Sequence, residues 1–235
     1  SIGPALALVI VWLILPSIPP KISDKPDEHL LDLRPALKNR KVMGYTIAYF
    51  AHCAELMGFA TWIVAFLTYS HGLQNAGTIG TALSIGSIAT FVTLLAVPSS
   101  VLGNEVSVRY GRLPVLRVVM FGSAIIGIIL GFSATFIFPI VLCLLILYGI
   151  TVTADSATIT AGVVDVADPR YRGTVMATYS LIGFLGASIG PVVFGLMLDL
   201  GGGESSSLGW KLAFASLAVM VCLGPIAVAQ GQKHL

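Results

Sequence analysis

Residues 174–198 read TVMATYSLIGFLGASIGPVVFGLML and contain no charged side chain. A helix needs about 20 predominantly apolar residues to cross the hydrocarbon core of a bilayer, so this stretch is long enough for one crossing. Gly183, Gly186 and Gly190 lie three and four residues apart on one helix face, where small residues allow a neighbouring helix to approach closely. Pro191 follows directly and weakens the hydrogen-bond ladder, so the helix could bend there. The stretch therefore predicts a membrane-spanning helix with a glycine face.

The rest of the chain is similarly apolar. Hydrophobic residues make up 56% of the 235 residues and charged residues 10%, with a mean hydropathy of +0.93, whereas a soluble domain has roughly 25% charged residues. No stretch has the roughly ten-residue alternation of an outer-membrane β-strand. We therefore predict an all-α membrane protein of about seven transmembrane helices. The qualifying segments are residues 3–19, 44–69, 77–98, 114–133, 137–163, 174–198 and 209–230.

Lysine and arginine are distributed very unevenly between the loops. Twelve of the thirteen fall into intervals that alternate along the chain and so share one side of the membrane, whereas Lys211 falls on the other side. Cytoplasmic loops carry an excess of basic residues, so we predict that these intervals and the C-terminus are cytoplasmic in an inner or plasma membrane. The twelve are Lys21, Lys25, Arg34, Lys38, Arg40, Lys41, Arg109, Arg112, Arg117, Arg170, Arg172 and Lys233.

The longest interval, residues 20–43, divides the chain. One predicted helix precedes it and six follow, which suggests the last helix of one bundle, a cytoplasmic linker and a complete second bundle. The chain starts with Ser1 directly before an apolar segment and lacks a signal-peptide pattern. We therefore expect residues 1–19 to be the last helix of an N-terminal bundle that lies upstream, and residues 44–235 to form a C-terminal six-helix bundle. Leucines of the linker could form a short interfacial helix despite Pro35.

The interval after segment 77–98 contains Arg109-Tyr110-Gly111-Arg112. It resembles the cytoplasmic loop of the major facilitator superfamily, whose pattern is G-x-x-x-D-R/K-x-G-R/K-R/K. Arg109, Gly111 and Arg112 occupy matching positions, while Asn104, Val108 and Leu113 replace the leading glycine, the acid and the last basic residue. The glycine permits a sharp turn, and the arginines are expected to anchor the loop at the lipid headgroups.

Residues 168–174 (DPRYRGT) and 180–191 (SLIGFLGASIGP), followed by Gly195 and Asp199, are similar to the entry loop and penultimate helix of the same superfamily. The resemblance covers essentially the whole chain, as the sixth through twelfth of twelve helices. It implies alternating access, in which two six-helix bundles rock against each other around a small solute held near the membrane midplane. It also implies that this bundle works with a missing N-terminal bundle of the same protein.

Ionisable side chains at bilayer depth are costly and mark functional sites by default. Glu55 lies near the middle of segment 44–69 with His52 one turn before it, and Asp155 lies in segment 137–163 among several threonines. We predict that these carboxylates face a central water-accessible cavity, which Tyr49 also lines, and form the substrate or proton pathway. Alternatively, Glu55 could bind His52 or a hydroxyl group and lock the bundle, and Asp155 could cap a helix break or pair with an arginine.

Other function classes find little support. Residues 186–190, GASIG, match the G-x-S-x-G pattern of hydrolases, but that motif needs a strand-to-helix turn, whereas this segment reads as continuous helix. We expect no catalytic residue, cofactor, metal or nucleic-acid partner, and Cys53, Cys143 and Cys222 lack metal-site spacing. The predicted function is secondary active transport of a small solute; the buried titratable groups suggest proton coupling, with uniport or exchange as alternatives. The competing hypothesis is a non-transporting half-size subunit or sensor that retains the bundle.

Overall fold

The computed structural model describes residues 2–14, 33–74 and 84–233, and this part of the chain is helical throughout, apart from short connections. The chain divides into two compact units, Ser1–Leu30 and Leu31–Leu235. The first unit contains α1, Ile2–Ile14, a helix made only of apolar residues. The end of the first predicted span, residues 15–19, lies outside the described residues.

The second unit contains six helical stretches that are long and apolar enough to cross a membrane, counted over the described residues. This finding confirms the predicted fold class, an all-α membrane protein, and six of the seven predicted spans. Some of the stretches consist of more than one helix. In chain order the elements are α3 (Arg40–Leu73), α4 (Ile85–Leu94), α5 (Ala96–Tyr110), α6 (Arg112–Phe132), the 3-10 helix η1 (Ser133–Thr135), α7 (Phe138–Ala154), α8 (Ser156–Val166), α9 (Arg172–Leu200) and α10 (Ser207–Gln232).

The predicted linker is partly helical. Helix α2, Arg34–Lys38, forms because Pro35 occupies its first turn, where the missing N–H costs no helical hydrogen bond. Asn39 then caps α3, because its side-chain oxygen accepts from the backbone N–H of Lys41 and Val42 at 3.1 and 3.2 Å. Residues 40–43, expected in the linker, therefore belong to α3, and residues 20–32 lie outside the described part.

The largest difference from prediction concerns residues 99–114. The sequence predicts that the second span of the six ends at Pro98 and that residues 102–114 form a loop. Instead, Pro98 lies in the first turn of α5 and the helix continues to Tyr110. The proline ring excludes a regular helix through the preceding turn, so it separates α4 from α5 at Leu95 without ending the span. Only Gly111, at φ 91°, forms the turn to α6, a conformation that glycine adopts without strain.

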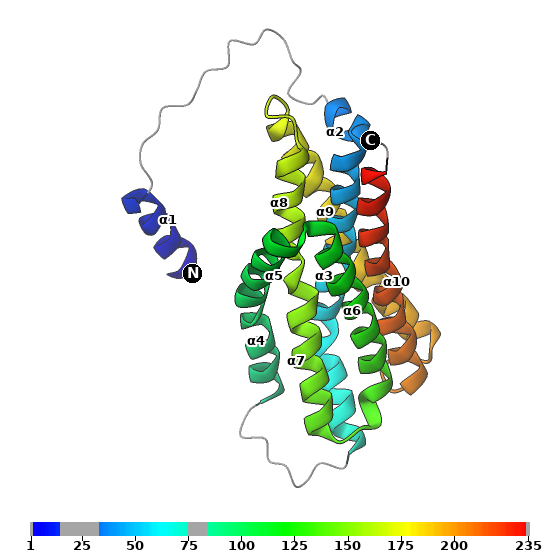
Figure 1. Ribbon diagram of the computed structural model, residues 1–235. Helices are drawn as coiled ribbons and strands as arrows, with labels where there is room; N and C mark the ends of the chain where they lie inside the picture. Colours follow the sequence, from blue (N-terminus) through cyan, green and yellow to red (C-terminus); the bar gives the residue numbers. More distant parts are fainter. Residues whose placement is uncertain (1, 15–32, 75–83, 234–235) are drawn as a thin grey trace. The chain divides into compact units, whose positions relative to one another are not determined.

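The basic residues gather at one end of the second unit, here called the basic end. The start of α3 contacts the end of α8, where Asn39 Nδ2 donates to the Val166 carbonyl at 3.4 Å. The end of α10 returns to the same place, where Gly231 lies against the backbone of Arg40 (Figure 1). At the opposite end, Ser70 Oγ donates to the Ala134 carbonyl at 2.9 Å, and Lys211 lies over the ring of Phe132. Every described lysine or arginine except Lys211 belongs to the basic end or to α2.

Helix α3 is the centre of this unit and packs on α9 through backbone contact. A Cβ added to Gly186 or Gly190 would overlap the carbonyl group of Phe50 or Ala54, respectively. Helix α9 is continuous through Pro191, whose carbonyl accepts from Trp62 Nε1 at 3.2 Å. The glycine face is therefore the surface on which α3 lies, and it fixes the position of the polar residues of α3.

Candidate functional site

The face of α3 that carries His52 borders an open pocket. The pocket has a volume of about 350 Å³, and a smaller one of about 180 Å³ adjoins it, because Leu56, Ala96 and Thr153 line both. Together they form one groove along α3, here called the α3 groove. Polar side chains line one end of it and apolar side chains the other. The polar end is lined by His52, Ser100, Thr153 and Ser156, and the apolar end by Met57, Phe59, Ile63 and Val92.

Two helix breaks border the α3 groove. Helices α4 and α5 separate at Leu95, and α7 and α8 separate at Asp155. The second break leaves backbone N–H groups at the start of α8 without helical acceptors. Ser100 of α5 compensates, because its Oγ accepts from the N–H of Ala157 at 3.2 Å. Both interruptions of regular helical hydrogen bonding therefore lie beside the groove.

His52 and Asp155 form a buried pair at the polar end. His52 Nδ1 lies 2.8 Å from Asp155 Oδ1, and each side chain is 2% exposed. The sequence leaves three roles open for Asp155: facing a cavity, capping a helix break or pairing with an arginine. It does lie at the break, but its side chain makes no cap hydrogen bond and instead faces the imidazole. A buried charge without a partner is strongly unfavourable, so each group compensates the other.

Glu55 lies in a different environment, although it is only three residues from His52. Its Oε1 accepts from Ser123 Oγ at 2.6 Å and from the Tyr148 hydroxyl at 3.0 Å, and the residue is fully buried. Gly127 leaves room for the Tyr148 ring. Glu55 therefore joins α3 to α6 and α7 through hydroxyl groups, which is one of the alternatives that the sequence left open. It is not among the residues lining the α3 groove.

Tyr49 stacks on other aromatic rings beside the pair. Its ring is 4.0 Å from that of Tyr179 at an interplanar angle of 9°, and 6.1 Å from His52 at 15°. Tyr179 is buried and shares a hydrogen bond with Thr160 at 2.9 Å. Gly183 lies against the Tyr49 ring, where a Cβ would overlap it. The stack holds one side of the imidazole in place. Sequence analysis missed Tyr179, although its position four residues before Gly183 places it on the glycine face of the same helix.

The loop motif forms a polar cluster at the basic end. Arg112 donates through Nε and Nη2 to Asp165 Oδ2 of α8, the former at 3.1 Å, and through Nη1 to Asn104 Oδ1 at 3.4 Å. Arg109 instead lies over the ring of Tyr110. The family pattern places its acid at position 108, which is valine here. Asp165, which sequence analysis did not single out, supplies a carboxylate to Arg112 from another helix.

Six apolar spans, three of which line a groove beside a buried ionisable pair, define a polytopic membrane protein. The family model of the Major Facilitator Superfamily matches residues 1–191 and, in a second and overlapping match, residues 76–230. The chain belongs to this superfamily, and membership implies secondary transport in general and not enzymatic activity. The resemblance drawn from the two motifs is thereby confirmed. None of the curated proteins compared with the chain is significantly similar to it.

Proposed function

We propose that this chain carries a small solute across the membrane by alternating access, together with an N-terminal bundle, and that the His52–Asp155 pair couples transport to protons. The observation that supports coupling is the position of the pair: the two groups lie 2.8 Å apart, and His52 lines the polar end of the α3 groove. Glu55, another predicted pathway residue, neither lines the groove nor bonds to a residue that does. We therefore assign the coupling role to Asp155 and His52.

The charge of the pair provides the physical link between proton and solute. A carboxylate beside an imidazolium is neutral overall, and the pair can stay buried in that form. Gain or loss of one proton leaves a net charge in a dry site, which is strongly unfavourable. Water or a polar group of the solute in the groove would compensate that charge. Protonation would therefore accompany opening of the site or binding of the solute.

The lining of the groove suggests the chemistry of the solute. Ser100, Ser156 and Thr153 offer hydroxyl groups near His52, whereas Ile63 and Val92 line the other end. A pocket of this kind binds a ligand with one polar group and an apolar body. We propose a small amphipathic solute as the substrate class.

The coupling proposal is tested with the full-length transporter in liposomes that enclose a pH-sensitive dye. A panel of small organic acids, amines, sugars and amphipathic drugs is added outside, and solute-dependent proton movement is recorded. Asp155→Asn should reduce solute-driven proton flux at least tenfold while the protein still inserts. Glu105→Gln is the matched control, because Glu105 is an exposed carboxylate on α5 outside the groove. Wild-type proton flux in Asp155→Asn would contradict the proposal.

We also propose that the basic end faces the cytoplasm. All described basic residues except Lys211 support this orientation, through the excess of lysine and arginine in cytoplasmic loops. In a variant without the natural cysteines, Ser206→Cys should react with an impermeant maleimide in intact cells. Lys38→Cys should react only after permeabilisation. The reverse pattern would overturn the orientation and leave the groove geometry unaffected.

A further inference from the structure

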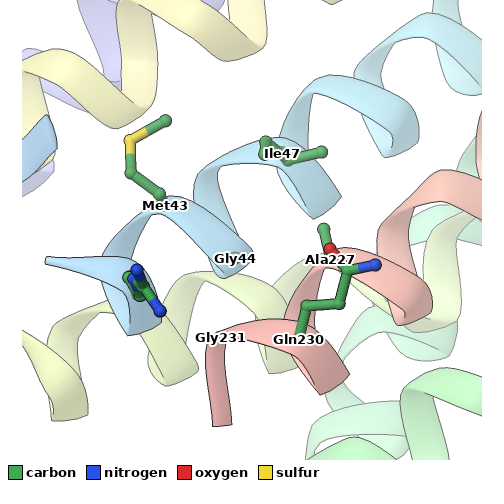
Figure 2. Close-up of a pocket in the computed structure, with 7 residues that line it drawn as sticks. Met43, Gly44, Ile47, Ala227, Gln230 and Gly231 are labelled. Atoms are coloured by element: carbon green, nitrogen blue, oxygen red, sulfur yellow. The ribbon is translucent and has the colours of Figure 1, made fainter. Parts of the chain in front are cut away.

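A separate pocket lies at the basic end, on another side of α3 from His52. It has a volume of about 260 Å³ and is formed between α3 and α10. Met43 and Ile47 precede His52 by nine and five residues, which places them about 180° and 140° around the helix from it. Figure 2 shows the lining residues of α3, Met43, Gly44 and Ile47, beside those of α10, Ala227, Gln230 and Gly231.

Close contact between two helix backbones forms the floor of this pocket. A Cβ added to Gly231 would lie 2.6 Å from the Arg40 carbonyl oxygen, and one added to Gly44 would lie 2.8 Å from the Ala227 carbonyl oxygen. Because no side chain fits between the helices there, the side chains on either flank form the walls of the pocket. Its polar groups are the Arg40 guanidinium and the Gln230 amide, and its walls are apolar.

A second pocket of about 190 Å³ lies on the other flank of α10, and Gln230 lines both. Arg117 and Lys233 supply its charges, and Phe121 and Ile226 its apolar wall. Arg40, Arg117 and Lys233 are exposed, and within the described ranges none of them pairs with a carboxylate. The end of α10 is therefore flanked by positive charges that no described acid compensates, each above an apolar surface.

We propose that the end of α10 is a binding site for anionic phospholipid. The lipid phosphate binds Arg40 and Gln230 on one flank, or Arg117 and Lys233 on the other, and the acyl chains lie along Ile47 and Phe121. Basic pockets between membrane helices bind anionic headgroups in this way. A lipid fits better than a soluble anion because the charged groups lie at the helix ends and the apolar walls continue along the spans, with Ile47 38% exposed. This site does not depend on the transport proposal.

The test is a lipid titration of the purified full chain in detergent, followed by native mass spectrometry. The probes are phosphatidylglycerol and, at the same concentration, phosphatidylcholine. The variant Arg40→Gln/Arg117→Gln should bind phosphatidylglycerol about fivefold more weakly at each pocket than the wild type, since each pocket loses one basic residue and a basic residue contributes about fivefold. The matched control, Arg170→Gln/Arg172→Gln, removes two exposed arginines from the same end but outside both pockets, and should retain wild-type affinity.

Three outcomes would overturn the proposal. Unchanged binding in Arg40→Gln/Arg117→Gln would show that the pockets do not hold the lipid. Equal weakening in the control would show general attraction to a basic surface. Displacement of phosphatidylglycerol by excess inorganic phosphate would assign the pockets to a soluble anion. Circular dichroism of both variants verifies that helix content is unchanged, which is expected because all four arginines are exposed.

Discussion

The two faces of α3 differ in how tightly neighbouring helices pack on them. Toward α9, glycines bring the backbones into contact, so that Gly186 and Gly190 lie against the carbonyl groups of Phe50 and Ala54. Toward α5, α7 and α8, the packing is open, and a pocket of about 350 Å³ remains beside His52. One face therefore has no room for an added methyl group, and the other has room for a solute.

This difference shows how one helix can hold a fixed position and still border a polar site. Without a hydrophobic force between helices in lipid, close packing of small residues supplies much of the association. The glycine contact fixes α3 against α9, so that α5 and α8 need not pack tightly on it. The backbone at the break before α8 is stabilised by a side chain of α5, since Ser100 Oγ accepts from the Ala157 N–H. The His52–Asp155 pair can therefore lie at the border of the groove.

The largest expected effect is on the tight face. In Gly190→Leu, the side chain would have to displace the α3 backbone at Ala54, because a Cβ alone already overlaps that carbonyl. Overpacking of this kind should cost on the order of 3 kcal/mol or more, enough to remove most folded protein. Monodisperse yield in size-exclusion chromatography, with thermal midpoint as the second measurement, reports the loss.

Gly122→Leu is the matched control for this prediction. Gly122 lies within α6, and nothing lies within 4 Å of a Cβ added to it. Its leucine variant should express and melt like the wild type, because the new side chain points into open space that lipid would fill. Equal yields for the two leucine variants would mean that the α3–α9 contact is not tight in the membrane.

The glycine face is predictable from sequence because its spacing follows directly from helix geometry. The surface of α3 that contacts this face could not be predicted, since nothing in the sequence of α3 indicates that the carbonyl groups of Phe50 and Ala54 contact the glycines. The span boundaries show the same division. The sequence predicts Pro98 as the end of a span, whereas the structure uses it as a break inside a longer one, because a proline is tolerated in the first turn of a helix.

The next effect in size concerns Glu55, which joins α3 to α6 and α7. Glu55→Ala would leave the buried hydroxyl groups of Ser123 and Tyr148 without their acceptor and open a cavity. The expected cost is about 2–3 kcal/mol in the free energy of unfolding. Glu55→Gln keeps an oxygen acceptor at the same place and should recover most of that loss, as measured by thermal denaturation in detergent.

Transport assays distinguish this structural role from a coupling role. If Glu55 locks α3 to α6 and α7, Glu55→Gln should keep the pH profile of uptake while Asp155→Asn changes it. A flattened pH profile in Glu55→Gln, at wild-type stability, would return Glu55 to the proton pathway. The sequence could not separate the two carboxylates, because both lie within predicted spans and their roles depend on neighbours from other helices.

The smallest expected effect is at the basic end, where Arg112 of α6 bonds Asp165 of α8. The side chains are 23% and 59% exposed, so solvent screens the pair and its coupling energy should be only about 0.5 kcal/mol. A double-mutant cycle with Arg112→Gln and Asp165→Asn, measured as unfolding free energy at low and at high salt, isolates that energy. It should fall toward zero at high salt, because an exposed pair is screened. Asn104→Ala removes the neutral acceptor of Arg112, so the change that it causes in the free energy of unfolding should not depend on salt. A coupling energy of several kcal/mol that persists in salt would instead show that α6 and α8 are held as rigidly here as α3 and α9 are by their glycines.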